Sequence, residues 1–345
     1  MIDNCDMNKI KPSYNKDRLI LGEALPLDTP FTVILDSSEK CNFKCYYCFR
    51  STQRIDKWGY ASDDSIMSME TFKRTVAQML EFPLQIKRIA LSNHGEPLYN
   101  NNLSKMIKYV KEMGLTGETD IHTNASLLNP DMAVDLAASG IDKVVVSVQG
   151  IDAKSYLMNS GRTIDFNLFC MNLELLYKNK HVDTVINIKT VDTALKDNTD
   201  VERFFNIFTG LADRVYIENV VPLYSQTDHS CIKGDKNYNK YGSVFQTVEC
   251  CPQVFYTLVV SPNGDIYPCA QIPPPVNLGN IYSTTLLESW NGSIREGFLH
   301  KHLEETRQSQ EYCGCCYVPQ NSVKTDHDII DAYRDIILLR MQNDK

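Results

Sequence analysis

The chain has 345 residues, and its 43% hydrophobic and 23% charged residues are typical of a globular protein. A net charge of −8 argues against a nucleic-acid partner, which binds clustered Lys and Arg side chains. The sequence contains no run of about eighteen apolar residues, which is the length that a membrane-spanning helix needs. The polar N-terminus does not fit a signal peptide. We therefore expect a cytoplasmic protein without a membrane partner, whose twelve cysteines are mainly metal ligands rather than disulfides.

From Phe31 onward, short apolar runs alternate with longer amphipathic ones, which predicts strands and helices in turn. The expected strands are Phe31–Leu35, Arg88–Leu91, Thr119–His122, Lys143–Val148, Val185–Lys189 and Arg214–Val220. The expected helices are Ser68–Phe82, Leu103–Met113, Pro130–Ser139, Phe166–Lys178 and Thr199–Phe208. Such alternation predicts parallel strands joined by right-handed crossovers. The predicted fold class is α/β, a partial (β/α)6 TIM barrel with active residues at the carboxyl ends of its strands.

The composition divides the chain into five segments. An arm at 1–28 lacks periodicity, the barrel occupies 29–221, and a turn-rich linker spans 222–240. A second unit with its own cysteines covers 241–325, and a C-terminal helix lies within 326–345. The apolar stripe of that helix is expected to dock against the body of the protein.

Cys41, Cys45 and Cys48 follow the first expected strand at C-x3-C-x2-C spacing. A cubane [4Fe–4S] cluster offers four thiolate positions, so three cysteines leave one iron open for a ligand that the protein does not supply. The alternative is a zinc site whose fourth ligand lies elsewhere in the chain. The spacing resembles that of the radical S-adenosylmethionine (radical SAM) enzymes, in which the open iron binds the amino and carboxylate groups of SAM. The resemblance implies this cluster and SAM as cofactors.

The second expected strand is followed by the turn Ser92–Pro97, which resembles the Gly-Gly-Glu-Pro motif of the radical SAM enzymes with His94 in place of the first glycine. Such a turn offers backbone carbonyls to the SAM ammonium group, and Gly95 permits a close approach. The alternative is an ordinary turn between a strand and a helix. The SAM-binding candidates in this turn are Asn93, His94, Gly95, Glu96 and Pro97.

Polar residues at the ends of further strands extend this candidate SAM site. Ser147 and Gln149 are two residues apart and therefore face the same way. The region of Ser147 followed by Arg162 resembles the fourth strand of the SPASM/twitch group of radical SAM enzymes, and Asn187 matches a polar position of that group. The candidates from the strand ends and the cysteine loop are Tyr47, Asn124, Ser147, Gln149 and Asn187. Solvated strand ends are the alternative.

A second set of cysteines surrounds an expected hairpin with its turn at Ser261–Asp265. The pattern resembles the twitch domain, the short form of the SPASM domain, and implies one auxiliary [4Fe–4S] cluster closed by four thiolates. The ligands preferred on spacing are Cys251, Cys269, Cys313 and Cys316. A zinc ribbon is the alternative metal site. Within the cysteine pairs, Cys250 and Cys315 are the alternative ligands.

The resemblance also implies a reaction. Radical SAM enzymes cleave SAM reductively to methionine and a 5′-deoxyadenosyl radical, using an external one-electron reductant such as flavodoxin or ferredoxin. A fully ligated auxiliary cluster fits an electron acceptor, so we expect oxidation of a carbohydrate-type alcohol, as in the similar aminocyclitol dehydrogenases. The catalytic candidates for the accompanying proton transfer are Glu218, Arg162, Lys189 and His94, among which the sequence does not select.

Three alternatives remain open. An epimerase of a sugar or peptide residue would use a cysteine thiol as hydrogen donor, for which Cys231 and Cys250 are candidates. Peptide maturation is the second alternative, although no peptide-recognition domain is expected before the first strand. The third is an iron–sulfur electron carrier without SAM turnover. The expected substrate is accordingly a small molecule or a peptide.

Overall fold

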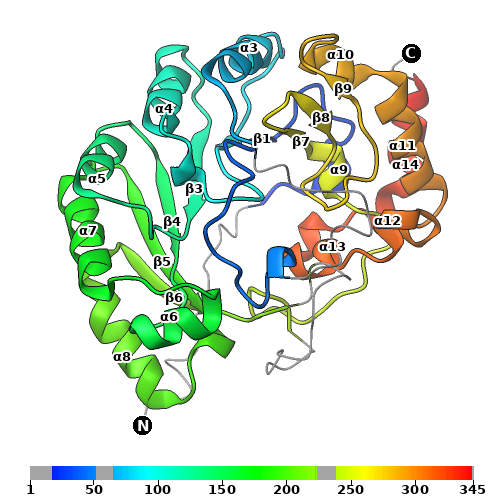
Figure 1. The fold of residues 1–345 in the computed structure, drawn as a ribbon. Coiled ribbons are helices and arrows are strands. Elements are labelled where there is room, and N and C mark those ends of the chain that lie inside the picture. The colour runs from blue at the N-terminus through cyan, green and yellow to red at the C-terminus, as the bar shows by residue number, and fades with distance from the viewer. Residues whose placement is uncertain (1–17, 52–64, 222, 224–237, 344–345) are drawn as a thin grey trace.

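The computed structural model describes residues 18–51, 65–221, 223 and 238–343. Within these residues, nine strands form one continuous sheet in the order β6-β5-β4-β3-β2-β1-β7-β8-β9. The sheet is curved, and helices lie along the outer side of its first six strands (Figure 1). The prediction of an α/β fold with a partial barrel is confirmed. Among the described residues, every helix is too short or too polar to cross a lipid bilayer.

Six parallel strands alternate with helices in the first part of the chain. The strands are β1 Thr32–Leu35, β2 Arg88–Ala90, β3 Glu118–Thr123, β4 Lys143–Ser147, β5 Val185–Val191 and β6 Arg214–Glu218. The helices are α3 Met69–Met79, α4 Leu103–Glu112, α5 Pro130–Ala137, α6 Ala153–Ser160, α7 Phe166–Asn179 and α8 Asn198–Phe208. All the strands and helices expected here are present, with their ends shifted by at most three residues.

Helix α6 is an addition to the expected elements. It begins with a reciprocal cap, in which the Asp152 side chain accepts from the Ser155 amide and the Ser155 hydroxyl accepts from the Asp152 amide. It ends at Gly161, whose φ of 68° is readily adopted by glycine. The hydrophobic pattern of this helix is weak because it buries only Tyr156 and Ser160, so periodicity alone does not reveal it.

The two faces of the parallel strands differ in character because successive side chains point to opposite faces. The outer face packs beneath the helices, and its buried side chains include Val33, Leu35, Ile89, Ile121, Val144, Val146, Ile186 and Ile188. Strand register places titratable residues together on the inner face, namely Arg88, Asp120, His122, Lys189 and Glu218. The barrel therefore has a polar interior rather than one filled with branched apolar side chains.

The C-terminal unit extends the same sheet. Strand β7 (Thr257–Val260) pairs in parallel with β1, from Thr32 opposite Thr257 to Leu35 opposite Val260. Strands β8 (Asp265–Tyr267) and β9 (Gly279–Asn280) follow in antiparallel pairing, which confirms the expected hairpin. The short helices around them are α9 Gln253–Tyr256, α10 Leu286–Asn291, α11 Ser293–Glu304, α12 Glu311–Gly314 and α13 Val318–Ser322. Most of the predicted linker at 222–240 lies outside the described residues.

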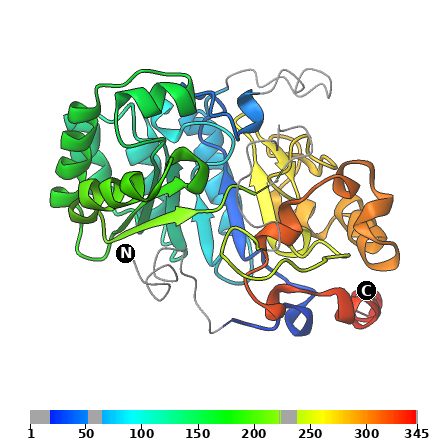
Figure 2. The ribbon, with the colours of Figure 1, turned by 90° about the horizontal axis from the view of Figure 1, so that it is seen from below.

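The two ends of the described chain pack together, as Figure 2 shows from below. Helix α2 (Leu21–Ala24) contacts the C-terminal segment, where Ile330 and Ile337 are fully buried. Ile330 and Ile337 thus dock the expected C-terminal stripe on the body, whereas Ile336 of the same stripe is 45% exposed. The helix is shorter than predicted, however, because α14 (Arg334–Asn343) begins only after two 3-10 turns. Asp331 there accepts hydrogen bonds from the amides of Glu249 and Cys250, which tie this segment to the beginning of the second unit.

Candidate active site

The first cysteine loop follows β1 and is held by contacts with α6. Phe43 is buried against Tyr156, and the Lys44 amide donates to the Ser160 carbonyl at 2.9 Å. The three thiols of Cys41, Cys45 and Cys48 lie close enough to influence one another electrostatically. Burial raises the pKa of each thiol, that of Cys41 to about 11.

Three mutually close, partly exposed thiols of this kind fit a metal cluster. They are neutral at ordinary pH and would release protons on binding iron. Because they come from one short loop, the remaining side of a bound cluster is free for another ligand. The donor set therefore fits the [4Fe–4S] cluster with one open iron that the spacing predicts.

The turn after β2 packs directly against the segment that leads into this loop. A Cβ atom on Gly95 would lie 2.3 Å from the Ser38 carbonyl oxygen, so only glycine fits there. The Glu96 amide donates to the Lys40 carbonyl at 2.8 Å. The candidate SAM turn and the cysteine loop are thus neighbours, as the resemblance implies.

Glu96 holds this turn rather than presenting its charge to a ligand. Its carboxylate accepts from the Thr123 hydroxyl at 2.5 Å, the Asn124 amide at 2.6 Å and the Leu98 amide at 3.1 Å. Burial raises the pKa of Glu96 to about 7, against the effect of these hydrogen bonds. Pro97 then begins a 3-10 turn at Pro97–Tyr99.

The polar candidates at the strand ends also make contacts within the protein. Asn124 donates to the Asn42 side chain at 2.9 Å, and Tyr47 donates to Gln149 at 2.8 Å. Gln149 in turn donates to the Ser147 carbonyl at 3.1 Å. These bonds order the cysteine loop around the ends of β3 and β4.

Two further candidates lie at opposite extremes of exposure. The Arg162 Nε donates to the Asn42 carbonyl at 3.0 Å, so this exposed side chain supports the cysteine loop instead of reaching into the barrel. Asn187 is buried on the inner face of β5, and its side-chain oxygen has no hydrogen-bond partner among the described residues. Asn187 is therefore a candidate to bind a ligand inside the barrel.

Two ion pairs and a histidine line the inner face. Arg88 binds Asp120 through two hydrogen bonds of 2.5 and 2.8 Å, and Lys189 pairs with Glu218. The His122 side chain is 49% exposed although it lies on a central strand, which indicates open space within the barrel. The surrounding protein, together with Lys189 and Arg88, lowers the pKa of His122 to about 3. Its imidazole is therefore neutral at ordinary pH.

Glu218, a catalytic candidate from the sequence, has the opposite character. Its burial acts to raise the pKa, but Lys189 and Lys240 outweigh that effect and lower it below the usual value. This carboxylate is therefore charged and held in its ion pair with Lys189. His122 was not among the catalytic candidates of the sequence, although the alternation of polar residues at Asp120, His122 and Asn124 is a signal for one polar face of a strand.

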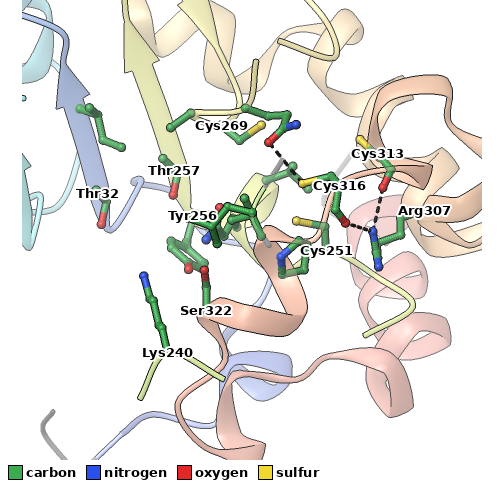
Figure 3. Close-up of a pocket in the computed structure, with 18 of the residues that line it drawn as sticks. Thr32, Lys240, Cys251, Tyr256, Thr257, Cys269, Arg307, Cys313, Cys316 and Ser322 are labelled. Atoms are coloured by element: carbon green, nitrogen blue, oxygen red, sulfur yellow. Dashed lines mark hydrogen bonds between the residues drawn. The ribbon is translucent and has the colours of Figure 1, made fainter. Parts of the chain in front are cut away.

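The second cysteine set lines a cavity of about 240 Å³. Figure 3 shows Cys251, Cys269, Cys313 and Cys316 gathered on one side of it. Arg307 is buried and holds their loops, since its Nη1 donates to the carbonyls of Cys313 at 2.7 Å and Cys316 at 2.6 Å. Four buried thiols around one cavity fit a fully ligated cluster.

The neighbouring cysteines point elsewhere. Cys250 is fully buried in the core beside α2, and the Cys315 thiol donates to the Tyr312 carbonyl at 3.4 Å. Neither lines the cavity. This placement favours Cys251 and Cys316 as ligands, and it sets Cys250 apart from the place expected for a hydrogen donor. Cys231 lies outside the described residues.

The auxiliary cavity continues to the inner face of the barrel. Its lining includes Ile34 and Arg88 on that face, together with Lys240 and Tyr256. In Figure 3, Thr32, Tyr256 and Lys240 lie on the side of the cavity away from Cys313. The second cysteine set is therefore adjacent to the polar interior onto which β2–β6 project their charged residues.

Comparisons with known proteins agree with this geometry. Residues 36–197 match the radical SAM superfamily, and residues 250–317 match the SPASM iron–sulfur cluster-binding domain. An uncharacterized protein of Methanocaldococcus jannaschii is 26% identical over 148 residues, which are 43% of this chain and 44% of that protein. A GTP 3′,8-cyclase of Gloeobacter violaceus is 32% identical over 126 residues, 36% of each chain. The chain thus aligns with less than half the length of these curated relatives.

Solved structures share the fold over most of the chain. SuiB of Streptococcus suis, bound to the precursor peptide SuiA, has a TM-score of 0.60 at 17% identity, covering 91% of this chain and 77% of SuiB. BtrN, in complex with AdoMet and 2-DOIA, has a TM-score of 0.52 at 18% identity, covering 86% of this chain and 96% of BtrN. The predicted family and cofactors, [4Fe–4S] clusters and SAM, are confirmed. The chain belongs to the radical SAM superfamily and is an enzyme of its SPASM/twitch group.

Proposed function

We propose that this radical SAM enzyme oxidises a carbohydrate-type alcohol inside its barrel, with an auxiliary cluster as electron acceptor. The observation that carries this proposal is the auxiliary cavity, which is lined by four cysteines and also by Ile34 and Arg88 of the inner face. An electron acceptor in that cavity would lie beside a substrate in the barrel. The polar inner face suits a ligand with several hydroxyl groups, because buried polar side chains need hydrogen-bond partners.

Each cysteine set has a separate role in this proposal. Cys41, Cys45 and Cys48 hold the first cluster, and the second is held by Cys251, Cys269, Cys313 and Cys316. When bound, these cofactors supply a 5′-deoxyadenosyl radical and an acceptor for one electron. The chain itself binds and orients the substrate, excludes water and moves the proton.

Oxidation of a secondary alcohol to a ketone removes a hydrogen atom from carbon, a proton from oxygen and one electron. We assign the proton to His122, because its imidazole is half-exposed on the inner face, where a substrate hydroxyl can reach it. The competing candidate Glu218 is less exposed, and its carboxylate is held in an ion pair with Lys189. Asn187 and the Arg88–Asp120 pair offer hydrogen bonds that would orient the hydroxyl groups.

The test is anaerobic turnover with SAM, dithionite and a panel of aminocyclitols and sugars in deuterated water, followed by mass spectrometry. A dehydrogenase forms 5′-deoxyadenosine together with a product that has two hydrogens fewer than the substrate. A product of unchanged composition that has gained carbon-bound deuterium would instead identify an epimerase. Failure to form 5′-deoxyadenosine with any substrate would contradict the proposal.

Matched variants link the reaction to the cavity. Cys269→Ser should stop oxidation yet leave SAM cleavage measurable, because Cys269 belongs to the auxiliary set. Cys315→Ser is the control, since this thiol does not line the cavity. Peptides form a second panel in the same assay, because the similar SuiB structure contains a precursor peptide. Flavodoxin or ferredoxin replaces dithionite in a final comparison of reductants.

A further inference from the structure

His94 contacts segments that belong to both cysteine sets. Its imidazole has only 9% of its side chain exposed, and its Nε2 lies 3.1 Å from the Ala270 carbonyl, immediately after Cys269. The edge-on ring of Phe49, immediately after Cys48, lies 5.9 Å from the imidazole centroid. A glycine at this position, as in the motif that the turn resembles, would make neither contact.

A third contact joins the same imidazole to the end of β1. Nδ1 lies 2.8 Å from an Asp36 carboxylate oxygen, and the His94 amide donates to that oxygen at 3.3 Å. The Asp36 amide in turn donates to the Val260 carbonyl at 2.9 Å, at the end of β7. A backbone carbonyl can only accept, so Nε2 is placed as a donor to Ala270, while Nδ1 faces Asp36. The Asn93 side-chain amide lies 3.1 Å from Nδ1 and 3.2 Å from Nε2.

The segment that His94 reaches has no regular secondary structure to fix its backbone. Residues 268–278 between β8 and β9 form no helix or strand. Gln271, which follows Ala270, accepts a hydrogen bond from the Cys316 thiol at 3.3 Å. A displacement of Ala270 would therefore be transmitted to the auxiliary cavity. Both Ala270 and Gln271 line that cavity.

We propose that His94 is a positioning residue that couples SAM binding to the order of the auxiliary-cluster loop. A ligand bound at the Asn93–Gly95 backbone fixes His94, and the Nε2 contact then fixes Ala270 and the loop around Cys269. The coupling concerns assembly of the site and does not depend on which substrate bond is oxidised.

Hydrogen–deuterium exchange of the reconstituted full chain, with and without SAM and without substrate, tests this coupling. In the wild-type protein, SAM should slow exchange both in the 92–97 turn and in peptides covering 266–278. In His94→Gly, SAM should slow exchange only in the turn, and the 266–278 peptides should exchange about fivefold faster, as expected for the loss of one hydrogen bond. His94→Gln retains a side-chain donor and should restore part of the response.

His94→Phe keeps a ring beside Phe49 but has no donor, so it isolates the hydrogen bond if the glycine variant does not fold. The control is His181→Gln, because His181 is an exposed residue just before β5 whose imidazole faces Asp183 in the same turn. Equal SAM-dependent protection of 266–278 in the wild-type and donor-free variants would overturn the proposal. Absence of that protection in the wild-type protein would overturn it as well.

Discussion

The carboxylate of Glu96 accepts a hydrogen bond from the Asn124 amide at 2.6 Å, and this contact joins the loops that follow β2 and β3. The same carboxylate accepts from the Thr123 hydroxyl and the Leu98 amide. A residue that resembles part of a cofactor motif therefore serves first to hold two strand ends together. This role has a measurable dependence on pH.

Because burial raises the pKa of Glu96 from 4.5 to about 7, the folded state favours its protonated form. The stability that Glu96 contributes is present below about pH 4.5 and is lost as the pH rises through about 7. The loss in the free energy of unfolding is on the order of 3 kcal/mol. Glu96→Gln should remove this trend while shifting the whole curve by a constant amount. Urea unfolding of the two apoproteins across pH 4.5–8 measures the pH dependence of the free energy of unfolding. Parallel curves for the two proteins would contradict the prediction.

Gly95→Ala should displace the SAM turn, because the new methyl group would lie 2.3 Å from the Ser38 carbonyl. We expect a loss of about 1–3 kcal/mol in stability, typical of overpacking, and about tenfold weaker SAM binding. Gly210→Ala is the matched control, since nothing lies within 4 Å of its added methyl group. Thermal unfolding and equilibrium dialysis with SAM compare the two variants. Equal effects would show that the close contact is unimportant.

Arg88→Ala should be destabilising, because the Asp120 side chain is only 1% exposed and would lose its cationic partner. Removing one partner of a fully buried pair costs about 3–5 kcal/mol, and because the Arg88 side chain is 40% exposed we expect about 1–3 kcal/mol. Lys143→Ala breaks the more exposed pair with Glu118 on neighbouring strands and should cost less than about 1 kcal/mol. Denaturant unfolding gives both values. The double variant Arg88→Ala/Asp120→Asn should recover part of the loss.

Arg307→Lys tests the support of the auxiliary cluster. A lysine ammonium cannot reproduce the planar guanidinium that binds the carbonyls of Val248, Cys313 and Cys316 together. After anaerobic reconstitution, we expect the iron content to fall from about eight to about four per chain. Arg203→Lys, at a half-exposed ion pair with Asp152, should keep about eight. Full iron content in Arg307→Lys would show that charge alone suffices.

The two adjacent cysteines near α12 should behave differently. Cys316→Ala should lose the auxiliary cluster, because its thiol lines the cavity, whereas Cys315→Ala should retain it. Iron and sulfide analysis, with the visible absorbance of the reconstituted protein, distinguishes them. The reverse result would exchange the ligand assignment within the pair.

The sequence allowed much of the barrel to be predicted because its outer face alternates strongly, as at Val144 and Val146. The cysteine spacing and the Gly95-Glu96-Pro97 turn likewise indicated the family. The pairing of β7 with β1 was not predictable, because an apolar run such as Thr257–Val260 does not specify its partner.

The interior of the barrel was predicted less well for a different reason. His122 and Arg88 acquire their roles from neighbours on other strands, which one strand's pattern does not contain. Helix α6 was missed because its face buries little apolar surface. The choice of Cys251 over Cys250 depended on spacing alone until the cavity showed which thiol faces it.

Because β1 pairs with β7, folding of the protein depends on the order in which these two strands are synthesised. Strand β1 is made early, yet one of its edges remains without hydrogen-bond partners until Thr257–Val260 has left the ribosome. Contacts between such distant parts of a chain form slowly and leave intermediates prone to aggregation. The first cysteine loop continues directly from this strand. Nascent chains are therefore expected to depend on chaperones until the last third of the polypeptide is complete, and iron insertion should be productive only afterwards.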